Sequence, residues 1–268
     1  MQDTIVVRPR QDPDARLRLI CLGFCGGGAG SYMPWADVLP EGVELAAICY
    51  PGREGRFAED CPDNWDELAE DAVAAVLSAA DRDYVLFGHS MGGWMAFDVA
   101  ARIEERGGPL PKALVVSSAN APSRGLTVQD MFPAQADTDE QIMHWMETFG
   151  LLPQHVLDDP DLREMALDLM RADVRIRDTF YYRDGAQVSV PVQVINGDAD
   201  EVIDPRAAEQ WRVLAAGAYR HDVLPGGHFY TPETWGSLPT RIPALYENAP
   251  ETAAPATTAA ATAPVLAA

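Results

Sequence analysis

The sequence predicts an α/β domain in which helices cover both faces of a mostly parallel β-sheet. Short apolar runs typical of buried strands lie at 17–23, 43–49, 84–87 and 114–117, and they alternate with segments of helical periodicity at 65–80 and 91–106. Strands that alternate with helices in this way pair in parallel, and their crossover helices cover the sheet. A chain of 268 residues can form such a core without disulfides or a structural metal.

The alternation is interrupted at 123–185, where helix-like stretches occur without a convincing strand. Strand patterns resume at 192–195 and 220–224, so we expect the intervening block to form a helical cap inserted into one domain of residues 1–248. Over 249–268 the chain consists mostly of Ala, Thr and Pro, a composition that cannot bury a core. We expect this tail to be disordered.

The charge and hydropathy of the chain narrow the classes of partner. With 41 acidic against 20 basic side chains the net charge is −21, and such a field repels nucleic acid. No apolar run reaches the roughly 18 residues that a membrane-spanning helix needs, and residues 1–13 lack the apolar segment of a secretory signal. We therefore expect a cytoplasmic protein that binds neither nucleic acid nor membranes.

The glycine and cysteine patterns do not indicate a cofactor. The run Gly26-Gly27-Gly28-Ala29-Gly30 does not fit the dinucleotide-binding pattern G-x-G-x-x-G, and it lacks the lysine of a phosphate-binding loop. The cysteines form no CxxC pair and show no zinc-like spacing with histidine; they are Cys21, Cys25, Cys49 and Cys61. We expect no metal and no cofactor.

The pentapeptide Gly88-His89-Ser90-Met91-Gly92 matches the G-x-S-x-G pattern of a nucleophile elbow. It lies between a predicted strand and a predicted amphipathic helix, which is the setting that this pattern requires. The serine then occupies a strained turn, and the flanking glycines let neighbouring segments approach closely. These features predict the α/β-hydrolase fold with Ser90 as the nucleophile. The alternative is an ordinary strand-to-helix turn with a capping serine.

A serine hydroxyl needs a base, and the order along the chain in this fold is Ser, acid, His. Of the five histidines, His228 follows the last predicted strand, where the base is expected. The acid should leave a strand end between Ser90 and His228, and three carboxylates compete there: Asp198, Asp200 and Asp204. Spacing from the strand end favours Asp200, with Asp198 as the main alternative.

The reaction also needs two backbone donors for the oxyanion. One should be the N–H of Met91, which opens a helix whose free N–H groups point toward the reacting oxygen. The other should come from the region Cys25-Gly26-Gly27, because it follows the first predicted strand and its glycines let the backbone approach a substrate. A plain flexible turn is the alternative for this region.

Several stretches of the chain, taken in order, carry a resemblance to a known family. They are Gly26-Gly27-Gly28-Ala29 with Pro34-Trp35, Tyr50-Pro51-Gly52-Arg53-Glu54, Phe87-Gly88-His89-Ser90-Met91-Gly92, Arg171-Ala172-Asp173 and Leu224-Pro225-Gly226-Gly227-His228-Phe229. Together they resemble the type II thioesterases, the stand-alone editing enzymes of polyketide and nonribosomal peptide synthesis. The resemblance covers residues 17–247, and the combination of stretches is what makes it specific.

The resemblance implies hydrolysis of acyl chains from the phosphopantetheine arm of acyl or peptidyl carrier proteins. A carrier protein or carrier domain is therefore the expected partner. The resemblance also implies that Ser90, Asp200 and His228 are the catalytic residues. The family usually has alanine where this chain has Cys25, whose backbone N–H is then the second oxyanion donor beside that of Met91. A backbone donor tolerates this change of side chain.

The predicted cap is rich in flexible and aromatic apolar side chains. Most of them should pack the cap against the body of the domain. Thioether groups adapt to varied acyl chains, however, so we expect some of these side chains to contact the substrate. The candidates are Met131, Phe132, Met143 and Met146.

Arginines of the predicted cap and of the stretch after the second predicted strand could bind a partner protein. Five arginines are candidate docking charges for an acidic carrier protein, although they could equally pair with neighbouring carboxylates: Arg53, Arg56, Arg171, Arg175 and Arg177. Asp173 interrupts the apolar stripe of its predicted helix, so we expect it to bond to a partner inside the cap.

Two other classes of function stay open. A carboxylesterase or an acyltransferase of the same fold would use the same residues, with an ester substrate or with an alcohol or amine in place of water. A catalytically silent binding protein would keep the fold without needing the order Ser, acid, His, which is intact here. Comparing a carrier thioester with a simple ester tests the first class, and labelling Ser90 with a fluorophosphonate tests the second.

Overall fold

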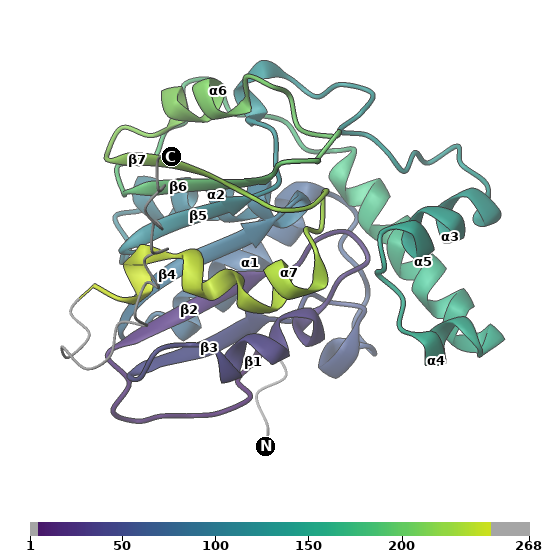
Figure 1. Ribbon diagram of the computed structural model, residues 1–268, viewed down its shortest axis with the longest axis horizontal. Helices are drawn as coiled ribbons and strands as arrows, with labels where there is room; N and C mark the ends of the chain where they lie inside the picture. Colours follow the sequence, from purple (N-terminus) through teal and green to yellow (C-terminus); the bar gives the residue numbers. More distant parts are fainter. Residues whose placement is uncertain (1–4, 248–268) are drawn as a thin grey trace, which may run out of the picture.

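The computed structural model describes residues 5–247, and the tail expected at 249–268 lies outside them. Within this range a seven-stranded sheet has the order β1-β3-β2-β4-β5-β6-β7 (Figure 1). The strands are β1 (Val6–Val7), β2 (Leu17–Leu22), β3 (Val43–Ile48), β4 (Asp83–His89), β5 (Ala113–Ser117), β6 (Val192–Gly197) and β7 (Tyr219–Leu224). Neighbouring strands are parallel, except that β1 runs antiparallel to β3. This mostly parallel sheet with its helices confirms the predicted α/β-hydrolase fold.

Helices flank the sheet and also form a separate group at one of its edges (Figure 1). They are α1 (Trp65–Ala79), α2 (Met91–Glu105), α3 (Asp139–Thr148), α4 (Gln154–Leu157), α5 (Pro160–Arg177), α6 (Ala207–Leu214) and α7 (Pro232–Ser237). The group α3, α4 and α5 comes from the segment between β5 and β6, and we call this segment, residues 123–185, the cap.

Alternate residues of the central strands build two apolar cores, one on each face of the sheet. On one face, Ile20 and Leu22 of β2 join a cluster that includes the buried residues of α1 and α2. On the other face, Leu19 and Cys21 join a cluster that includes Trp35 and the turns after α7. Successive side chains of a strand point to opposite faces, so two covered faces explain why the strands read as continuous apolar runs.

The structure departs from the sequence-based expectations near both ends of its described range. The sequence of the first dozen residues predicts a loose arm, whereas the structure has the strand β1 there, which is too short to leave a recognisable alternation. The sequence of 232–247 predicts a last helix broken at Pro239 and Pro243. In the structure α7 ends at Ser237 and two 3₁₀ turns follow, since proline has no N–H for a helical ladder.

Ser90 lies between β4 and α2 on a turn that depends on close backbone packing. Its φ of 53° is a left-handed conformation, which costs a non-glycine residue about 1–3 kcal/mol. Its N–H donates to the carbonyl of Ser117 at 2.8 Å and so ties the turn to β5. A Cβ on Gly88 would lie 1.8 Å from the carbonyl oxygen of Gly92, and a Cβ on Gly92 would lie 2.6 Å from that of Leu22. Only glycine fits at these two positions.

The substitution Gly88→Ala tests this close approach. The added methyl group would overlap a backbone oxygen in the first turn of α2, so we expect the melting temperature to fall by about 10 °C or more, or folded protein not to accumulate. Gly236→Ala is the matched control, because a methyl group there has nothing within 4 Å and lies in α7. Thermal unfolding followed by circular dichroism makes the comparison. Equal melting temperatures for the two variants would contradict the close approach.

Candidate active site

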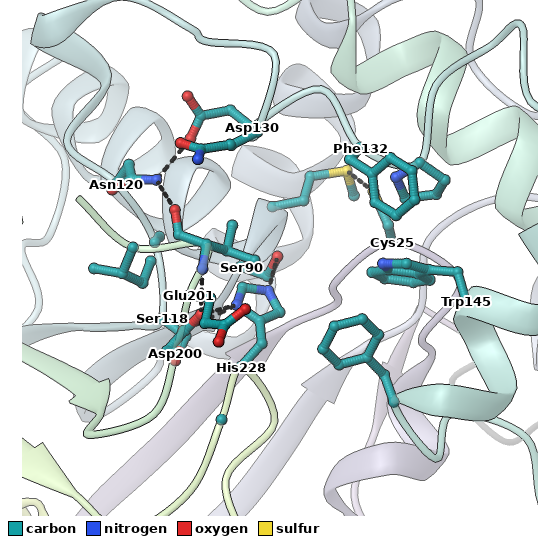
Figure 2. Close-up of a pocket in the computed structure, with 18 of the residues that line it drawn as sticks. Cys25, Ser90, Ser118, Asn120, Asp130, Phe132, Trp145, Asp200, Glu201 and His228 are labelled. Carbon is teal, nitrogen blue, oxygen red and sulfur yellow. Dashed lines mark hydrogen bonds and ion pairs between the residues drawn. The ribbon is translucent and has the colours of Figure 1, made fainter.

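Three side chains that follow separate strands meet at the elbow (Figure 2). Nε2 of His228 lies 3.0 Å from Oγ of Ser90, and its Nδ1 lies 3.0 and 3.3 Å from the two carboxylate oxygens of Asp200. The Asp200 side chain is fully buried, and its Oδ1 also accepts the N–H of Val202 at 3.1 Å. In this arrangement an imidazole can take the serine proton while the carboxylate holds the opposite ring nitrogen.

The other two strand-end carboxylates make different contacts. Oδ1 of Asp198 accepts the N–H of Gly226 at 2.9 Å, which ties the end of β6 to the loop that carries His228. Oδ1 of Asp204 accepts the N–H of Arg206 at 2.8 Å. Of the three candidates, Asp200 is therefore the carboxylate that the structure brings to the histidine.

A buried chain of hydrogen bonds lies next to the imidazole of His228. The Tyr230 hydroxyl donates to the carbonyl of Ile195 at 3.0 Å and lies 2.7 Å from Oγ of Ser117, which lies 3.0 Å from Nδ1 of His89. Because the Tyr230 proton is already used, Ser117 donates to Tyr230, and the Nδ1–H of His89 donates to Ser117. Burial, and secondarily the nearby His228, lowers the pKa of His89, so this ring is neutral. The sequence pointed to neither Ser117 nor Tyr230.

A cavity of about 350 Å³ opens at Ser90 and has two unlike walls (Figure 2). The apolar wall consists of Met91, Trp94, Phe132, Trp145 and Phe149. The polar wall includes Ser118, Asn120, Asp130 and Glu201. An apolar pocket with a few polar groups is the usual form of a small-molecule site.

Of the four residues expected to contact the substrate, one lines the cavity and three do not. Phe132 lines the cavity, and its ring lies 6.3 Å from that of Trp145. Met131, Met143 and Met146 are not among the lining residues. Met146 is 1% exposed and belongs with Ile142 to the buried face of α3, whereas Met143 is half-buried against the core. The carbonyl of Met131 accepts a hydrogen bond from Arg177.

The polar wall is largely occupied by its own hydrogen bonds. The carboxylate of Asp130 accepts from Asn120 at 2.7 Å, from Arg124 at 2.6 and 2.8 Å, and from both the N–H and the hydroxyl of Thr127. Asn120 also donates to the carbonyl of Val202 at 3.0 Å. These hydrogen bonds hold the first residues of the cap against the loop that carries Asp200.

The region expected to hold the oxyanion also borders the cavity. Cys25 and Met91 both line it, and Met91 opens α2, whose first N–H groups lack partners within the helix. The thiol of Cys25 lies 3.3 Å from the sulfur of Met91. Burial raises the pKa of Cys25 to about 12, so its side chain is a neutral thiol.

Most of the arginines considered as docking charges are engaged in ion pairs or hydrogen bonds. Arg53 pairs with Asp173, and Arg56 pairs with Asp71 and Glu59; both arginines are buried. Arg177 is also buried and donates to carbonyls of the segment that leads into α3 and to Asp178. Arg171 pairs with Asp139 at the surface, and Arg175 is exposed.

The expectation that Asp173 bonds to a partner inside the cap is wrong. Its carboxylate accepts hydrogen bonds from Arg53, which follows β3, and from the N–H of Gly26, which follows β2. Helical periodicity places a polar side chain on the buried face of a helix but does not say which element lies opposite, and here that element is the body of the domain.

Two further observations concern the described part of the chain as a whole. Between residues 5 and 247, no group of three or more His, Cys, Asp or Glu side chains is arranged to hold a metal ion. No helix in that range is both long enough and apolar enough to cross a membrane.

The parallel sheet, the strained elbow and the hydrogen-bonded serine, histidine and aspartate at the strand ends define an α/β-hydrolase-fold protein. A family model described as a thioesterase domain matches residues 17–244, which is most of the chain. The protein belongs to the thioesterase family, whose members hydrolyse thioesters.

Individual relatives confirm the resemblance that the sequence motifs indicate. The chain is 32% identical over 227 residues to thioesterase PikA5 of Streptomyces venezuelae, covering 84% of this chain and 79% of that protein. It is 37% identical over 213 residues to the AMB antimetabolite synthetase AmbE of Pseudomonas aeruginosa, but spans only 10% of the length of that synthetase. Among solved structures, the type II thioesterase BorB from the borrelidin biosynthetic cluster is 33% identical with a TM-score of 0.80, over 91% of this chain and 99% of that one.

The raised pKa of Cys25 has a measurable consequence. With a pKa of about 12, only about one thiol in ten thousand is ionised near pH 8, so iodoacetamide should modify Cys25 far more slowly than the partly exposed Cys61, even though Cys25 lines the cavity. Peptide mapping by mass spectrometry after timed alkylation measures both rates. Alkylation of Cys25 as fast as that of Cys61 would mean that its thiol is not protonated as described.

Proposed function

We propose that this protein is a serine thioesterase that hydrolyses acyl groups from the phosphopantetheine arm of carrier proteins in polyketide, nonribosomal peptide or related biosynthesis. The observation that carries the proposal is the hydrogen-bonded series Ser90, His228 and Asp200, which opens onto a cavity of about 350 Å³. In this proposal residues 1–248 act as one catalytic domain with the cap over its site. The four free cysteines are typical of a reducing compartment, and we place the protein in the cytoplasm.

The reaction would proceed through an acyl-enzyme. Nε2 of His228 takes the proton of Ser90 while Oγ attacks the thioester carbonyl, and Asp200 stabilises the resulting imidazolium. The N–H groups of Met91 and Cys25 donate to the oxyanion. The imidazolium then protonates the departing carrier thiol, which leaves an ester on Ser90. Water that gives a proton to His228 attacks this ester, and the acid departs with the serine restored.

The relatives support the choice of a carrier-bound thioester. BorB is described as a type II thioesterase from a biosynthetic cluster, and AmbE is an antimetabolite synthetase that matches this chain over a small part of its length. We therefore infer that this chain acts on the intermediates of a comparable pathway, with an acyl carrier protein or carrier domain as its partner. The net charge of −21 supports a partner other than nucleic acid.

The apolar wall of the cavity is the proposed acyl site. Phe132, Trp145 and Phe149 belong to the cap and line the cavity that opens at Ser90, and the rings of Trp145 and Phe149 lie 4.8 Å apart. The rings of Phe149 and His228 lie 6.1 Å apart, so an acyl chain along this wall begins at the catalytic histidine. Met143 and Met146 belong to the same apolar cluster as Trp145 and would support this wall from behind rather than touch the acyl chain.

The proposed roles predict unequal effects for neighbouring residues. Ser90→Ala should lower kcat by about 10³-fold or more, since it removes the nucleophile, and Asp200→Asn should lower it by about 10²–10⁴-fold, since the amide cannot stabilise the imidazolium. Asp198→Asn is the matched control in the same loop, and it should stay within about threefold of wild type because the amide oxygen of asparagine can still accept the N–H of Gly226. Mass spectrometry of acyl-loaded carrier proteins, before and after incubation, measures these rates.

The outcomes separate the alternatives. If Ser90→Ala still deacylates carriers at the wild-type rate, the proposed mechanism fails. If Asp198→Asn is the impaired variant, the acid is misassigned. If a simple ester is cleaved as efficiently as the carrier thioester, the protein is a general esterase and not a thioesterase for carrier proteins.

The acyl site can be tested through chain length. Trp145→Ala removes an indole from the apolar wall, so it should shift the ratio of kcat/KM for decanoyl over butyryl carriers in favour of the longer chain by about tenfold. Phe57→Ala is the control, because Phe57 is a 62% exposed aromatic residue outside the cavity. An unchanged ratio in Trp145→Ala would mean that the aromatic residues of the cap do not form the acyl site.

A further inference from the structure

One buried carboxylate joins three separate elements beside the active site. Asp173 of α5 is 0% exposed. Its Oδ1 accepts Nη2 of Arg53 at 2.6 Å, and its Oδ2 accepts Nη1 of Arg53 at 3.0 Å and the N–H of Gly26 at 2.8 Å. The cap helix α5, the turn after β3 and the loop after β2 therefore meet at a single side chain.

Two adjacent residues of the turn after β2, Gly26 and Gly27, are held by this cluster. The N–H of Gly26 is part of the peptide unit that begins at the carbonyl of Cys25, so its bond to Asp173 sets the orientation of that peptide plane. Nη1 of Arg53 donates to the carbonyl of Gly27 at 2.8 Å. The N–H of Gly27 in turn donates to the carbonyl of Phe24 at 2.8 Å. This carbonyl belongs to the peptide unit that carries the N–H of Cys25, so the orientation of that N–H depends on the position of Gly27.

The cap helix also shapes the turn by direct contact. Gly26 has a φ of 71°, and a Cβ at this position would lie 2.6 Å from the terminal methyl group of Met170, one helical turn before Asp173 on α5. Gly26 therefore lies directly against the Met170 side chain of α5. The conformation of this turn depends on where α5 lies.

We propose that Asp173 is a positioning residue, which through Gly26 and Arg53 holds the backbone N–H of Cys25 toward the acyl oxygen on Ser90. The cap helix α5 is then a part of the catalytic machinery, because the oxyanion donor is formed only while α5 is seated. This inference rests on the proposed function, in which the Cys25 N–H stabilises the oxyanion. Fixed donors aimed at a developing charge are effective because they need no reorganisation during the reaction.

A neighbouring ion pair also contains a buried arginine but does not contact the loop after β2. Arg56 lies three residues after Arg53, is also buried, and binds Asp71 of α1 through two hydrogen bonds of 2.7 and 2.8 Å. Its backbone contact is the carbonyl of Cys49, at the end of β3, rather than the loop beside Ser90. Asp71 is therefore the matched control for a loss of charge next to a buried arginine.

The experiment compares Asp173→Asn with Asp71→Asn in the full chain. An amide has a single acceptor oxygen and its NH₂ group donates, so the substituted side chain cannot satisfy both Arg53 and Gly26. We expect kcat for an acyl-carrier thioester to fall about 10²-fold in Asp173→Asn with KM within about threefold, whereas Asp71→Asn stays within about threefold in both. Melting temperatures verify that both variants are folded.

Two inhibitors distinguish positioning from a general structural defect. An acyl trifluoromethyl ketone forms a tetrahedral adduct with the serine and needs the oxyanion donors, whereas the thioether analogue of the substrate binds without them. In Asp173→Asn the affinity for the ketone should fall about 10²-fold, while the affinity for the thioether should change less than about threefold. If both affinities fall together, or if kcat is unchanged in the folded variant, the inference is wrong.

A second variant covers the case in which Asp173→Asn does not fold. Arg53→Lys keeps a positive charge against Asp173 but cannot reach Asp173 and the Gly27 carbonyl with one planar fork, so kcat and ketone affinity should each fall about tenfold. Unchanged values would overturn the inference. Failure of the proposed function would look different, because Ser90→Ala would then keep its activity whatever Asp173→Asn does.

Discussion

Parallel strands end at the same edge of a sheet, and this constraint places every group of the site. Strands β4, β6 and β7 lead directly to Ser90, Asp200 and His228, while β2 leads to Cys25 and β5 ends at Ser117. Residues as far apart as 138 positions in the chain meet within hydrogen-bonding distance for this reason. Strand register, which the packing of the core maintains, therefore determines the distances on which the proposed chemistry depends.

The cap is attached at the same edge, and its attachment is electrostatic as well as apolar. Burial disfavours the charge of Arg53, but the adjacent carboxylate of Asp173 more than compensates and raises the pKa of Arg53. A buried ion pair of this kind adds little net stability, since desolvation offsets much of the attraction. Its significance is geometric: it specifies where α5 meets the loop after β2, which a purely apolar contact would leave less well defined.

The sequence alone is sufficient to predict an element of the structure where a local pattern of residues determines that element. Buried strands and the turn at Ser90 have signatures within a few residues, so strands β2 to β7 and the elbow could be predicted. Among the three strand-end aspartates, spacing from the strand end favours Asp200 but does not exclude Asp198, because the conformation of their loop decides which one reaches His228. The partner of Asp173 was also beyond prediction, since Arg53 is 120 positions away and the facing surfaces of cap and body are set by tertiary packing.

The residue before the proposed nucleophile shows how packing affects the charge of the site. The ring of His89 lies 5.3 Å from that of His228, so a proton on His89 would oppose the imidazolium that forms when His228 acts as the base. His89 is fully buried and surrounded by the rings of Phe24, Phe229 and Trp235, and burial lowers its pKa. Because an aromatic cluster keeps His89 neutral, no second positive charge lies beside the imidazolium of the proposed mechanism. The electrostatic environment of Ser90 therefore depends on the core behind the triad as well as on the triad itself.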